Sequence, residues 1–208
     1  MSIPDIRVII ADDHPVVCDG LEATLNSSPY ITVAGIAANF IEVLTLLETV
    51  HSDVLVLDIC GMGGAPLTLV TRIRREYPDL AIVVFSSSID LAPELLQMGV
   101  YGYVIKEELS MQLIAAVCAA YARQPYLSPT VEEHLLRTDA LHRQYALAPQ
   151  ELKVLQLLSN GLGTSAIAEE LSIDPRSAQN YITTLRRKTG CQERTQLVEW
   201  YRQIYYGQ

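Results

Sequence analysis

Short runs of apolar and β-branched residues, separated by stretches with helical periodicity, constrain this chain of 208 residues more than any other feature. Strands that alternate with helical patterns are typical of βαβ units in a parallel sheet. The predicted strands are residues 7–11, 31–36, 54–58, 81–86 and 101–105, and the predicted helices are residues 15–27, 39–50, 67–76, 91–98 and 109–122. Residues 1–124 are therefore predicted to form an α/β domain of the (βα)5 type.

The composition changes after residue 124. Pro125 and Pro129 end the helical pattern, and residues 130–145 are polar with weak periodicity. We therefore predict a linker with a short helix at residues 125–146, followed by an all-α domain at residues 147–208. The four helices predicted in that domain are residues 149–159, 164–171, 175–189 and 194–205.

The net charge of −9 is spread unevenly along the chain. Residues 1–124 hold 15 acidic and 6 basic residues, whereas residues 147–208 hold 6 acidic and 7 basic residues. Phosphate contacts dominate the affinity of proteins for nucleic acids. The acidic first part is therefore a poor nucleic-acid binder, and the charge asymmetry indicates two different tasks.

No apolar run reaches the roughly 18 residues that a membrane-spanning helix needs. The first residues lack the basic start and the apolar core of a signal peptide. The four cysteines form no Cys-x-x-Cys pair, which is typical of reduced thiols in a cytosolic protein. We therefore expect a soluble, cytoplasmic protein that does not interact with a membrane.

Acidic residues directly follow two of the predicted strands. Asp12 and Asp13 come after the first strand, and Asp58 ends the third. The carboxyl ends of parallel strands share one edge of the sheet, where open α/β sheets build their sites. Carboxylates gathered there repel one another unless a divalent cation such as Mg²⁺, or a lysine, lies between them. Lys106, which follows the fifth strand, is the matching lysine.

This arrangement predicts phosphoryl transfer onto a carboxylate. Asp58 would accept the phosphoryl group, Asp13 would bind Mg²⁺ directly and Asp12 would bind it through water. The cation would neutralise the charge that develops on the transferred group. Lys106 would pair with one phosphoryl oxygen, and the hydroxyl of Ser86, at the end of the fourth strand, could donate to another. The alternative is a structural network of ion pairs.

The segments Ile9–Pro15, Val54–Asp58 and Gly102–Lys106 resemble those of a response-regulator receiver domain, and the resemblance covers residues 5–122. It implies a flavodoxin-like fold with the strand order 2-1-3-4-5 and with the site at the switch point. It also implies that a sensor histidine kinase phosphorylates Asp58.

The same resemblance implies the roles of the neighbouring residues. Asp12, Asp13 and Asp58 would hold Mg²⁺ together with the backbone carbonyl of Cys60. Ser86 and Lys106 would read the phosphate, and Tyr103 matches an aromatic residue that swings inward on activation.

The loop after Asp58 departs from the pattern of that family. Gly61 and Met62 stand where Met and Pro are usual, and Pro66 stands where Gly is usual. The loop holds three glycines, so we expect it to be looser than in other receiver domains. This departure affects the expected metal geometry, the phosphate lifetime and the fit to a kinase. His14 is expected to be an exposed residue at the start of the first helix.

The helices predicted at residues 164–171 and 175–189 form a helix-turn-helix pattern. Asp174 is a good N-cap and Pro175 a good first residue for the second helix. The inner face consists of Ile167, Ala168, Leu171, Ile173, Ala178, Ile182 and Leu185. The outer face of the second helix presents side chains that can pair with base edges or phosphates, namely Arg176, Gln179, Asn180, Thr183 and Arg187. The alternative is a small helical module for protein contacts.

This second region also resembles a LuxR-type DNA-binding domain, over residues 146–207. The matching residues are Leu147–Glu151, Val154, Leu155, Gly161, Ile167, Ala168, Leu171, Lys188, Gly190, Arg194 and Thr195. A receiver domain followed by this domain is typical of the NarL/FixJ group of response regulators, which bind promoter DNA as dimers. The candidate DNA contacts are Thr164, Ser165, Arg176, Ser177, Gln179, Asn180, Thr183, Arg187 and Lys188.

Two positions that are commonly basic in the LuxR-type domain are not basic here. Ser165 stands where Lys is common, Ser177-Ala178-Gln179 stands where Thr-Val-Lys is common, and Tyr181 stands where His is common. Each lost phosphate contact weakens binding at any DNA sequence, so we expect tight binding to need a homodimer. A dimer face, or alternatively ordinary packing, could be formed by Trp200, Tyr201, Tyr205 and Tyr206.

The sequence therefore favours a DNA-binding transcription regulator of a two-component system, controlled by phosphorylation. Its only chemistry would be Mg²⁺-dependent phosphorylation and dephosphorylation of Asp58. The alternative is an atypical regulator that acts by constitutive dimerisation or protein contact, independently of phosphorylation. A haloacid-dehalogenase-like phosphatase is disfavoured, because it needs a second aspartate two residues after the first and Cys60 stands there.

Overall fold

The computed structural model describes residues 5–108 and 110–206, so Leu109, which we placed at the start of the fifth helix, lies outside the described residues. The chain divides into two compact units, and the division falls between Glu132 and Glu133, inside the predicted linker. Within the described ranges, no helix is both long enough and apolar enough to span a bilayer.

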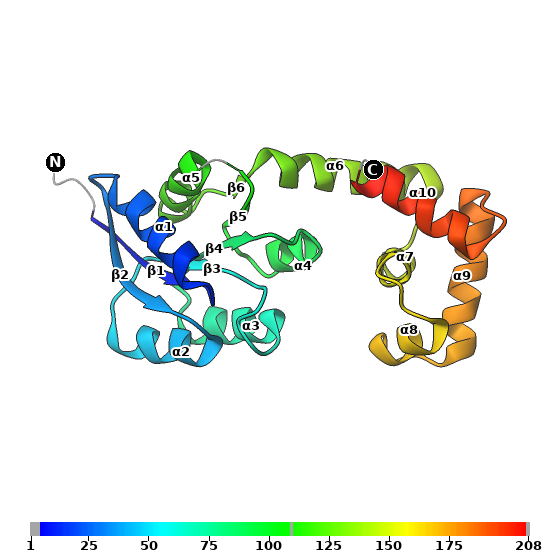
Figure 1. The fold of residues 1–208 in the computed structure, drawn as a ribbon, viewed down its shortest axis with the longest axis horizontal. Helices are drawn as coiled ribbons and strands as arrows, with labels where there is room; N and C mark the ends of the chain where they lie inside the picture. Colours follow the sequence, from blue (N-terminus) through cyan, green and yellow to red (C-terminus); the bar gives the residue numbers. More distant parts are fainter. Residues whose placement is uncertain (1–4, 109, 207–208) are drawn as a thin grey trace. The chain divides into compact units, whose positions relative to one another are not determined.

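A parallel sheet forms the centre of the first unit (Figure 1). Its strands are β1 (Ile6–Ala11), β2 (Ile31–Ala37), β3 (Val54–Leu57), β4 (Ala81–Ser86), β5 (Gly102–Ile105) and β6 (Tyr126–Leu127). Their spatial order is β2-β1-β3-β4-β5-β6. The predicted α/β fold with the order 2-1-3-4-5 is confirmed, and β6 extends the sheet beside β5.

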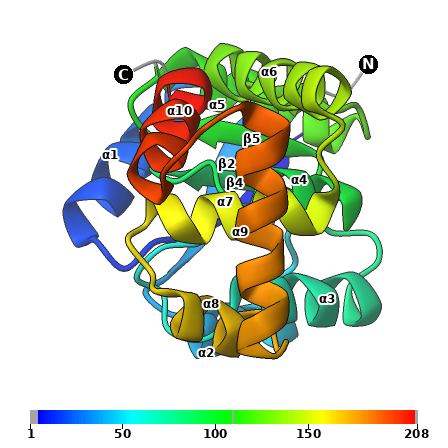
Figure 2. The same cartoon turned by 90° about the vertical axis from the view of Figure 1, so that its right-hand side faces the viewer.

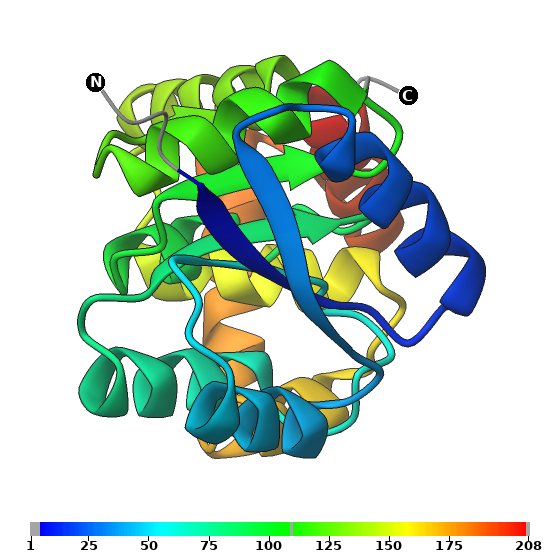
Figure 3. The ribbon, with the colours of Figure 1, turned by 90° about the vertical axis from the view of Figure 1, so that its left-hand side faces the viewer.

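Helices cover both faces of this sheet. They are α1 (Pro15–Asn26), α2 (Phe40–Thr49), α3 (Pro66–Glu76), α4 (Ala92–Gln97) and α5 (Ser110–Tyr121). Helices α1 and α5 lie over one face, whereas α2 and α3 lie over the other (Figures 1 and 3). A core cluster joins buried side chains of α1, α5 and the strands, among them Leu25, Val83 and Leu113. Strands β3, β4 and β5 are buried along their whole length, as expected for a sheet covered on both faces.

The register of the sheet determines which residues meet at its carboxyl edge. Ala11 of β1 pairs with Leu57 of β3, so Asp12 and Asp58 leave the sheet side by side. Ser86 of β4 pairs with Ile105 of β5, the residue before Lys106. The ends of four neighbouring strands therefore bring the predicted site residues to one place.

Residues 126–145 hold more regular structure than the predicted linker with a short helix, and that prediction is corrected. Strand β6 pairs with β5, and α6 runs from Pro129 to Tyr145 over 17 residues. Between them, the N–H of Ser128 donates to the carbonyl of Tyr103. The buried residues of α6 are Val131, His134, Thr138 and Leu141. The hydrophobic periodicity is weak because two of these four inward positions are polar.

The second unit contains most of α6 and the helices α7 (Pro149–Ser159), α8 (Thr164–Glu170), α9 (Pro175–Thr189) and α10 (Arg194–Tyr206). Helices α8 and α9 form the predicted helix-turn-helix, and α9 also packs against α7 and α10 (Figure 2). Asp174 caps α9 by accepting a hydrogen bond from the Ser177 N–H at 2.9 Å. Gly190, with a φ of 79°, ends the helix in the left-handed conformation. The predicted inner face lies in the core of this unit.

Candidate functional site

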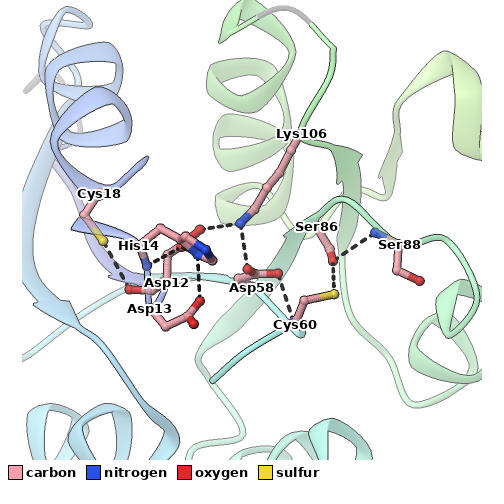
Figure 4. A network of polar contacts seen from close by, with 9 residues as sticks. All are labelled: Asp12, Asp13, His14, Cys18, Asp58, Cys60, Ser86, Ser88 and Lys106. Carbon is pink, nitrogen blue, oxygen red and sulfur yellow. Dashed lines mark hydrogen bonds and ion pairs between the residues drawn. The ribbon is translucent and has the colours of Figure 1, made fainter. Parts of the chain in front are cut away.

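The carboxylates of Asp12 and Asp58 share the ammonium group of Lys106 (Figure 4). Lys106 Nζ donates to Oδ2 of each aspartate, and both distances are 2.6 Å. The two aspartate side chains are only 1% exposed and the lysine side chain is 18% exposed. A cation at this point offsets the repulsion between two buried carboxylates, which is the role we predicted for Mg²⁺ or a lysine.

Two opposing effects act on the protonation of Lys106. Burial disfavours its charge, but hydrogen bonds to Asp12 and Asp58 outweigh burial, so the pKa of Lys106 is raised above its ordinary value. The lysine is therefore charged at neutral pH.

The second oxygen of each carboxylate, Oδ1, accepts a hydrogen bond from the backbone of the loop that follows it. Asp12 Oδ1 accepts a hydrogen bond from the N–H of His14 at 2.9 Å, and Asp58 Oδ1 accepts one from the N–H of Cys60 at 3.1 Å. A bond from an Asp side chain to the backbone two residues later is an Asx-turn. Local sequence therefore fixes the orientation of both carboxylates, and their Oδ2 atoms bond to the shared lysine.

Asp13 lies next to this pair, and its carboxylate contacts Gly61. Asp13 Oδ1 is buried and accepts no hydrogen bond from the described part of the chain. A Cβ atom at position 61 would lie 2.4 Å from Asp13 Oδ2, and Gly61 has a φ of 75°. Only glycine meets both conditions without strain. Any other residue at position 61 would therefore displace the carboxylate of Asp13 as well as strain the backbone.

Met62 anchors the loop that we expected to be loose. Its side chain is buried, and its carbonyl accepts a hydrogen bond from the N–H of Phe40 at 3.2 Å. Gly63 and Gly64 follow with φ values of 73° and 86°. The three glycines therefore allow backbone conformations that other residues rarely adopt, on both sides of one buried side chain.

Four residues at this edge could hold a metal ion. Asp12, Asp13, His14 and Asp58 offer ligand atoms that all lie within 4.8 Å of one another. The buried Oδ1 of Asp13 has His14 Nδ1 2.9 Å away and is an acceptor that a cation would also satisfy. Carboxylate oxygens are the ligands that Mg²⁺ prefers. The residues therefore fit the predicted cation, whereas the carbonyl of Cys60 stays a prediction.

Ser86 contacts Cys60 beside Asp58 (Figure 4). The hydroxyl of Ser86 is buried, lies 3.3 Å from Cys60 Sγ and accepts a hydrogen bond from the N–H of Ser88 at 3.3 Å. The sequence predicted a role for the carbonyl of Cys60 but gave no signal for its thiol. The two residues belong to different strand ends, so only the fold brings the thiol to Ser86.

Tyr103 is fully buried in β5, and its hydroxyl donates to the carbonyl of Ser88 at 2.6 Å. Burial raises the pKa of Tyr103, so the phenol stays neutral and remains a donor. Ser88 therefore links two predicted site residues, because its N–H bonds to Ser86 and its carbonyl bonds to Tyr103.

The candidate DNA contacts fall into two groups. The exposed residues are Ser165, Arg176, Gln179, Asn180, Thr183 and Arg187. Thr164, Ser177 and Lys188 are partly buried and have partners within the unit. Thr164 Oγ1 accepts a hydrogen bond from Arg194 at 3.4 Å, and Ser177 takes part in the cap of α9.

Lys188 joins α9 to the beginning of α7. Its Nζ lies 2.6 Å from Oε2 of Glu151, whose side chain is 6% exposed, and it also donates to the carbonyl of Ala146. The same glutamate oxygen accepts the N–H of Ala148 at 2.7 Å. In this structure the ammonium group of Lys188 is therefore an internal ion-pair partner, and its contact with DNA stays a prediction.

Three aromatic residues of α10 pack within the second unit. Tyr201 is 1% exposed, and its ring stacks on that of Tyr205 with centroids 4.4 Å apart. Trp200 meets Tyr145 edge to face at 5.0 Å. These contacts agree with the packing interpretation of the aromatic residues, and the side chain of Tyr206 lies outside the described residues.

Two protein families match this chain. The response regulator receiver domain matches residues 8–118, and the bacterial regulatory proteins of the luxR family match residues 145–201. The chain is 30% identical over 199 residues to the transcriptional regulatory protein LiaR of Bacillus subtilis, covering 92% of this chain and 94% of LiaR. It is 30% identical over 198 residues to the DNA-binding transcriptional activator DevR/DosR of Mycobacterium tuberculosis, covering 92% and 91%.

Solved structures show the same likeness. The response regulator RcsB in a complex with DNA superimposes with a TM-score of 0.67 at 25% identity, covering 94% of this chain and 97% of that chain. The isolated REC domain of RcsB from Salmonella enterica serovar Typhimurium, with the phosphomimetic BeF3⁻, superimposes with a TM-score of 0.57 at 27% identity, covering 62% and 97%.

A receiver domain joined to a LuxR-type domain defines a two-component response regulator that acts on transcription. The chain belongs to this family, in its NarL/FixJ group.

Proposed function

We propose that Asp58 accepts a phosphoryl group from a sensor histidine kinase and that this phosphorylation controls the binding of promoter DNA, in the cytoplasm. The observation that carries the proposal is the ammonium group of Lys106, 2.6 Å from both Asp12 and Asp58 at the edge of the sheet. This geometry supplies a nucleophilic carboxylate and an ammonium group close enough to pair with a negatively charged phosphoryl oxygen after the transfer.

Residues of this chain would accept the phosphoryl group, hold the cation and stabilise the charge during the transfer. An oxygen of Asp58 would attack phosphorus while the bond from phosphorus to the kinase imidazole nitrogen breaks. Mg²⁺, held by Asp12, Asp13, Asp58 and the carbonyl of Cys60, would supply positive charge to the transferred group. Lys106 would exchange its bond with Asp58 for one with a phosphoryl oxygen.

The contacts around Ser88 support a route from Asp58 to Tyr103. If Ser86 turned its hydroxyl from Cys60 Sγ to a phosphoryl oxygen, the hydrogen bond from the Ser88 N–H would break or move with it. The carbonyl of the same Ser88 holds the Tyr103 hydroxyl. Phosphorylation would therefore shift the loop that follows β4 together with the ring, and would change the population of a homodimer.

The output of the switch would be the exposed face of α9. Arg176, Gln179, Asn180, Thr183 and Arg187 are exposed there, and a homodimer would place two such helices in successive major grooves. RcsB, which this chain resembles over both domains, has been solved on DNA.

Phosphorylation of Asp58 can be tested on Phos-tag gels with the full-length protein, MgCl₂ and acetyl phosphate. We expect a slower band for the wild type and none for Asp58→Asn. Asp53→Asn is a matched control, because Asp53 precedes β3 at the opposite end of the strand and accepts the N–H of Arg7 at 2.8 Å. A shifted band that persists in Asp58→Asn would contradict the proposal.

A second candidate is a regulator whose dimerisation and DNA binding do not depend on phosphorylation. The observation that favours it is Tyr103, whose ring is already buried and whose hydroxyl is held by Ser88 through contacts that do not involve Asp58. Equal DNA affinity for the wild type and Asp58→Asn, with and without acetyl phosphate, would support this second candidate.

A further inference from the structure

His14 belongs to the acidic cluster although its side chain is largely exposed. Its Nδ1 lies 2.9 Å from Asp13 Oδ1 and 3.3 Å from Asp12 Oδ1, and the side chain is 66% exposed. The family-wide roles of the aspartates do not explain this nitrogen. Its position at the mouth of the cluster raises the question of what the imidazole binds there.

The backbone holds His14 in this position from both sides. Its N–H donates to Asp12 Oδ1 at 2.9 Å, and its carbonyl accepts the N–H groups of Val17 and Cys18 in the first turn of α1. Pro15 follows as the first residue of that helix. The base of the side chain is therefore fixed beside the aspartates.

The distances agree with two neighbouring ligands of one metal ion. Bonds of about 2.1 Å at right angles place two ligand atoms about 3.0 Å apart. The separation between His14 Nδ1 and Asp13 Oδ1, 2.9 Å, has this value. Asp13 Oδ1 is buried, and its 2.9 Å separation from His14 Nδ1 is also the distance of an ion pair with a protonated imidazole. If Nδ1 carries no proton, it and Asp13 Oδ1 would both be available to one cation.

We propose that His14 supplies an imidazole ligand to the cation site of Asp12, Asp13 and Asp58, so that this site prefers transition-metal dications to Mg²⁺. The inference rests on the cation site of the proposed function. Carboxylates alone suit Mg²⁺, whereas imidazole nitrogen suits ions such as Ni²⁺ and Zn²⁺. One nitrogen among oxygen ligands therefore raises the affinity of the site for these ions. Mg²⁺ would still bind at the same site, but with lower affinity.

The first test detects the nitrogen directly. Untagged full-length protein is loaded with Mn²⁺ as a spin probe, and electron spin-echo modulation reports a directly bound imidazole nitrogen. We expect the nitrogen signal in the wild type and in His51→Gln, and its loss in His14→Gln. His51 is a matched control, because it is an exposed histidine whose Nε2 also lies near a carboxylate, 3.8 Å from Asp53.

The second test measures selectivity by calorimetric titration of Ni²⁺ and Mg²⁺. We expect His14→Gln to weaken Ni²⁺ binding about tenfold and Mg²⁺ binding by less than about threefold, in line with the preference of imidazole for the later ions. His51→Gln should change neither affinity.

The possible outcomes separate this inference from the proposed function. An absent nitrogen signal in the wild type, or one that persists in His14→Gln, contradicts the inference and leaves His14 as a neighbour of the aspartates only. Phosphorylation of Asp58 in MgCl₂ is measured separately on the same preparations. Its failure would contradict the proposed function, whereas a His14-dependent nitrogen signal would still establish the mixed ligand set.

Discussion

The acidic edge of the sheet was predicted from a more specific pattern than the exposed face of α9, and the two regions also differ in how firmly the structure fixes their residues. At the sheet edge, Asp12, Asp58 and Lys106 come from three strand ends, and Lys106 Nζ lies 2.6 Å from a carboxylate oxygen of each aspartate. On α9, Arg187 is exposed, whereas Lys188, the next residue, is held by buried Glu151.

The difference arises from the constraints on each region. The register of a buried sheet leaves one position for the residue that follows each strand. On the surface of a helix, a long basic side chain can adopt conformations that contact solvent, DNA or a neighbouring carboxylate. A motif at a strand end therefore predicts which site residues contact one another. A motif on a helix surface predicts only which residues are candidates for contacting DNA.

The largest effect is expected where a charge is removed from the acidic edge. Lys106→Met leaves two buried carboxylates without their cation, so we expect a loss of about 3 kcal/mol in the stability of the first unit. Mg²⁺ should restore part of this loss. Urea unfolding followed by far-UV circular dichroism, with and without MgCl₂, measures the loss. Trp200, the only tryptophan, lies in the second unit. Its fluorescence should therefore report an unchanged unfolding transition for that unit.

A similar substitution tests the internal role of Lys188. Lys188→Met leaves the carboxylate of Glu151 without its ion-pair partner and nearly buried. We therefore expect the unfolding free energy of the second unit, followed by Trp200 fluorescence, to fall by about 2 kcal/mol. The double variant Glu151→Gln/Lys188→Met should recover part of the loss. An unchanged transition together with weaker DNA binding would show that Lys188 acts at the surface instead, and would remove the contrast between the two regions.

Gly61 and Gly63 form a matched pair in the loop after β3. Both have positive φ, so an alanine at either position should cost about 1 kcal/mol in stability. Only the Cβ at position 61 would meet the carboxylate of Asp13, because position 63 has open space. We expect Gly61→Ala to weaken Mg²⁺ binding about tenfold, through displacement of a ligand, and Gly63→Ala to leave it unchanged. Equal Mg²⁺ affinities in calorimetric titration would contradict this account of the loop.

The smallest effect is expected on the exposed face of α9. Arg187→Ala should weaken DNA binding several-fold at every sequence and lower the slope of log K against log salt by about 1, because one phosphate contact is lost. Arg143→Ala is the control, since that side chain is 82% exposed on α6. Fluorescence anisotropy at several salt concentrations measures both slopes. Equal slopes for the two variants would remove Arg187 from the interface.

Most of the fold followed from sequence because buried strands and capped helices leave local signals. The apolar runs gave β1 to β5, and Asp174 with Gly190 gave the ends of α9. Strand β6 was missed because it has only two residues, and the length of α6 was missed because His134 and Thr138 occupy inward positions that periodicity assigns to apolar residues.

The site was predictable to the same extent. The residues at strand ends were found because a carboxylate after an apolar run is visible in sequence. The contact between Cys60 and Ser86 and the fit of Gly61 to Asp13 depend on how separate loops approach one another. No spacing along the chain encodes these approaches.

The central claim is that phosphorylation of Asp58 controls DNA binding, and one titration tests it directly. Full-length wild type and Asp58→Asn are titrated onto DNA that the acetyl phosphate-treated wild type has selected from a random library. We predict that acetyl phosphate raises the affinity of the wild type about tenfold or more, a coupling typical of two-state switches, and leaves Asp58→Asn unchanged. Equal affinities with and without acetyl phosphate in the wild type would contradict the claim.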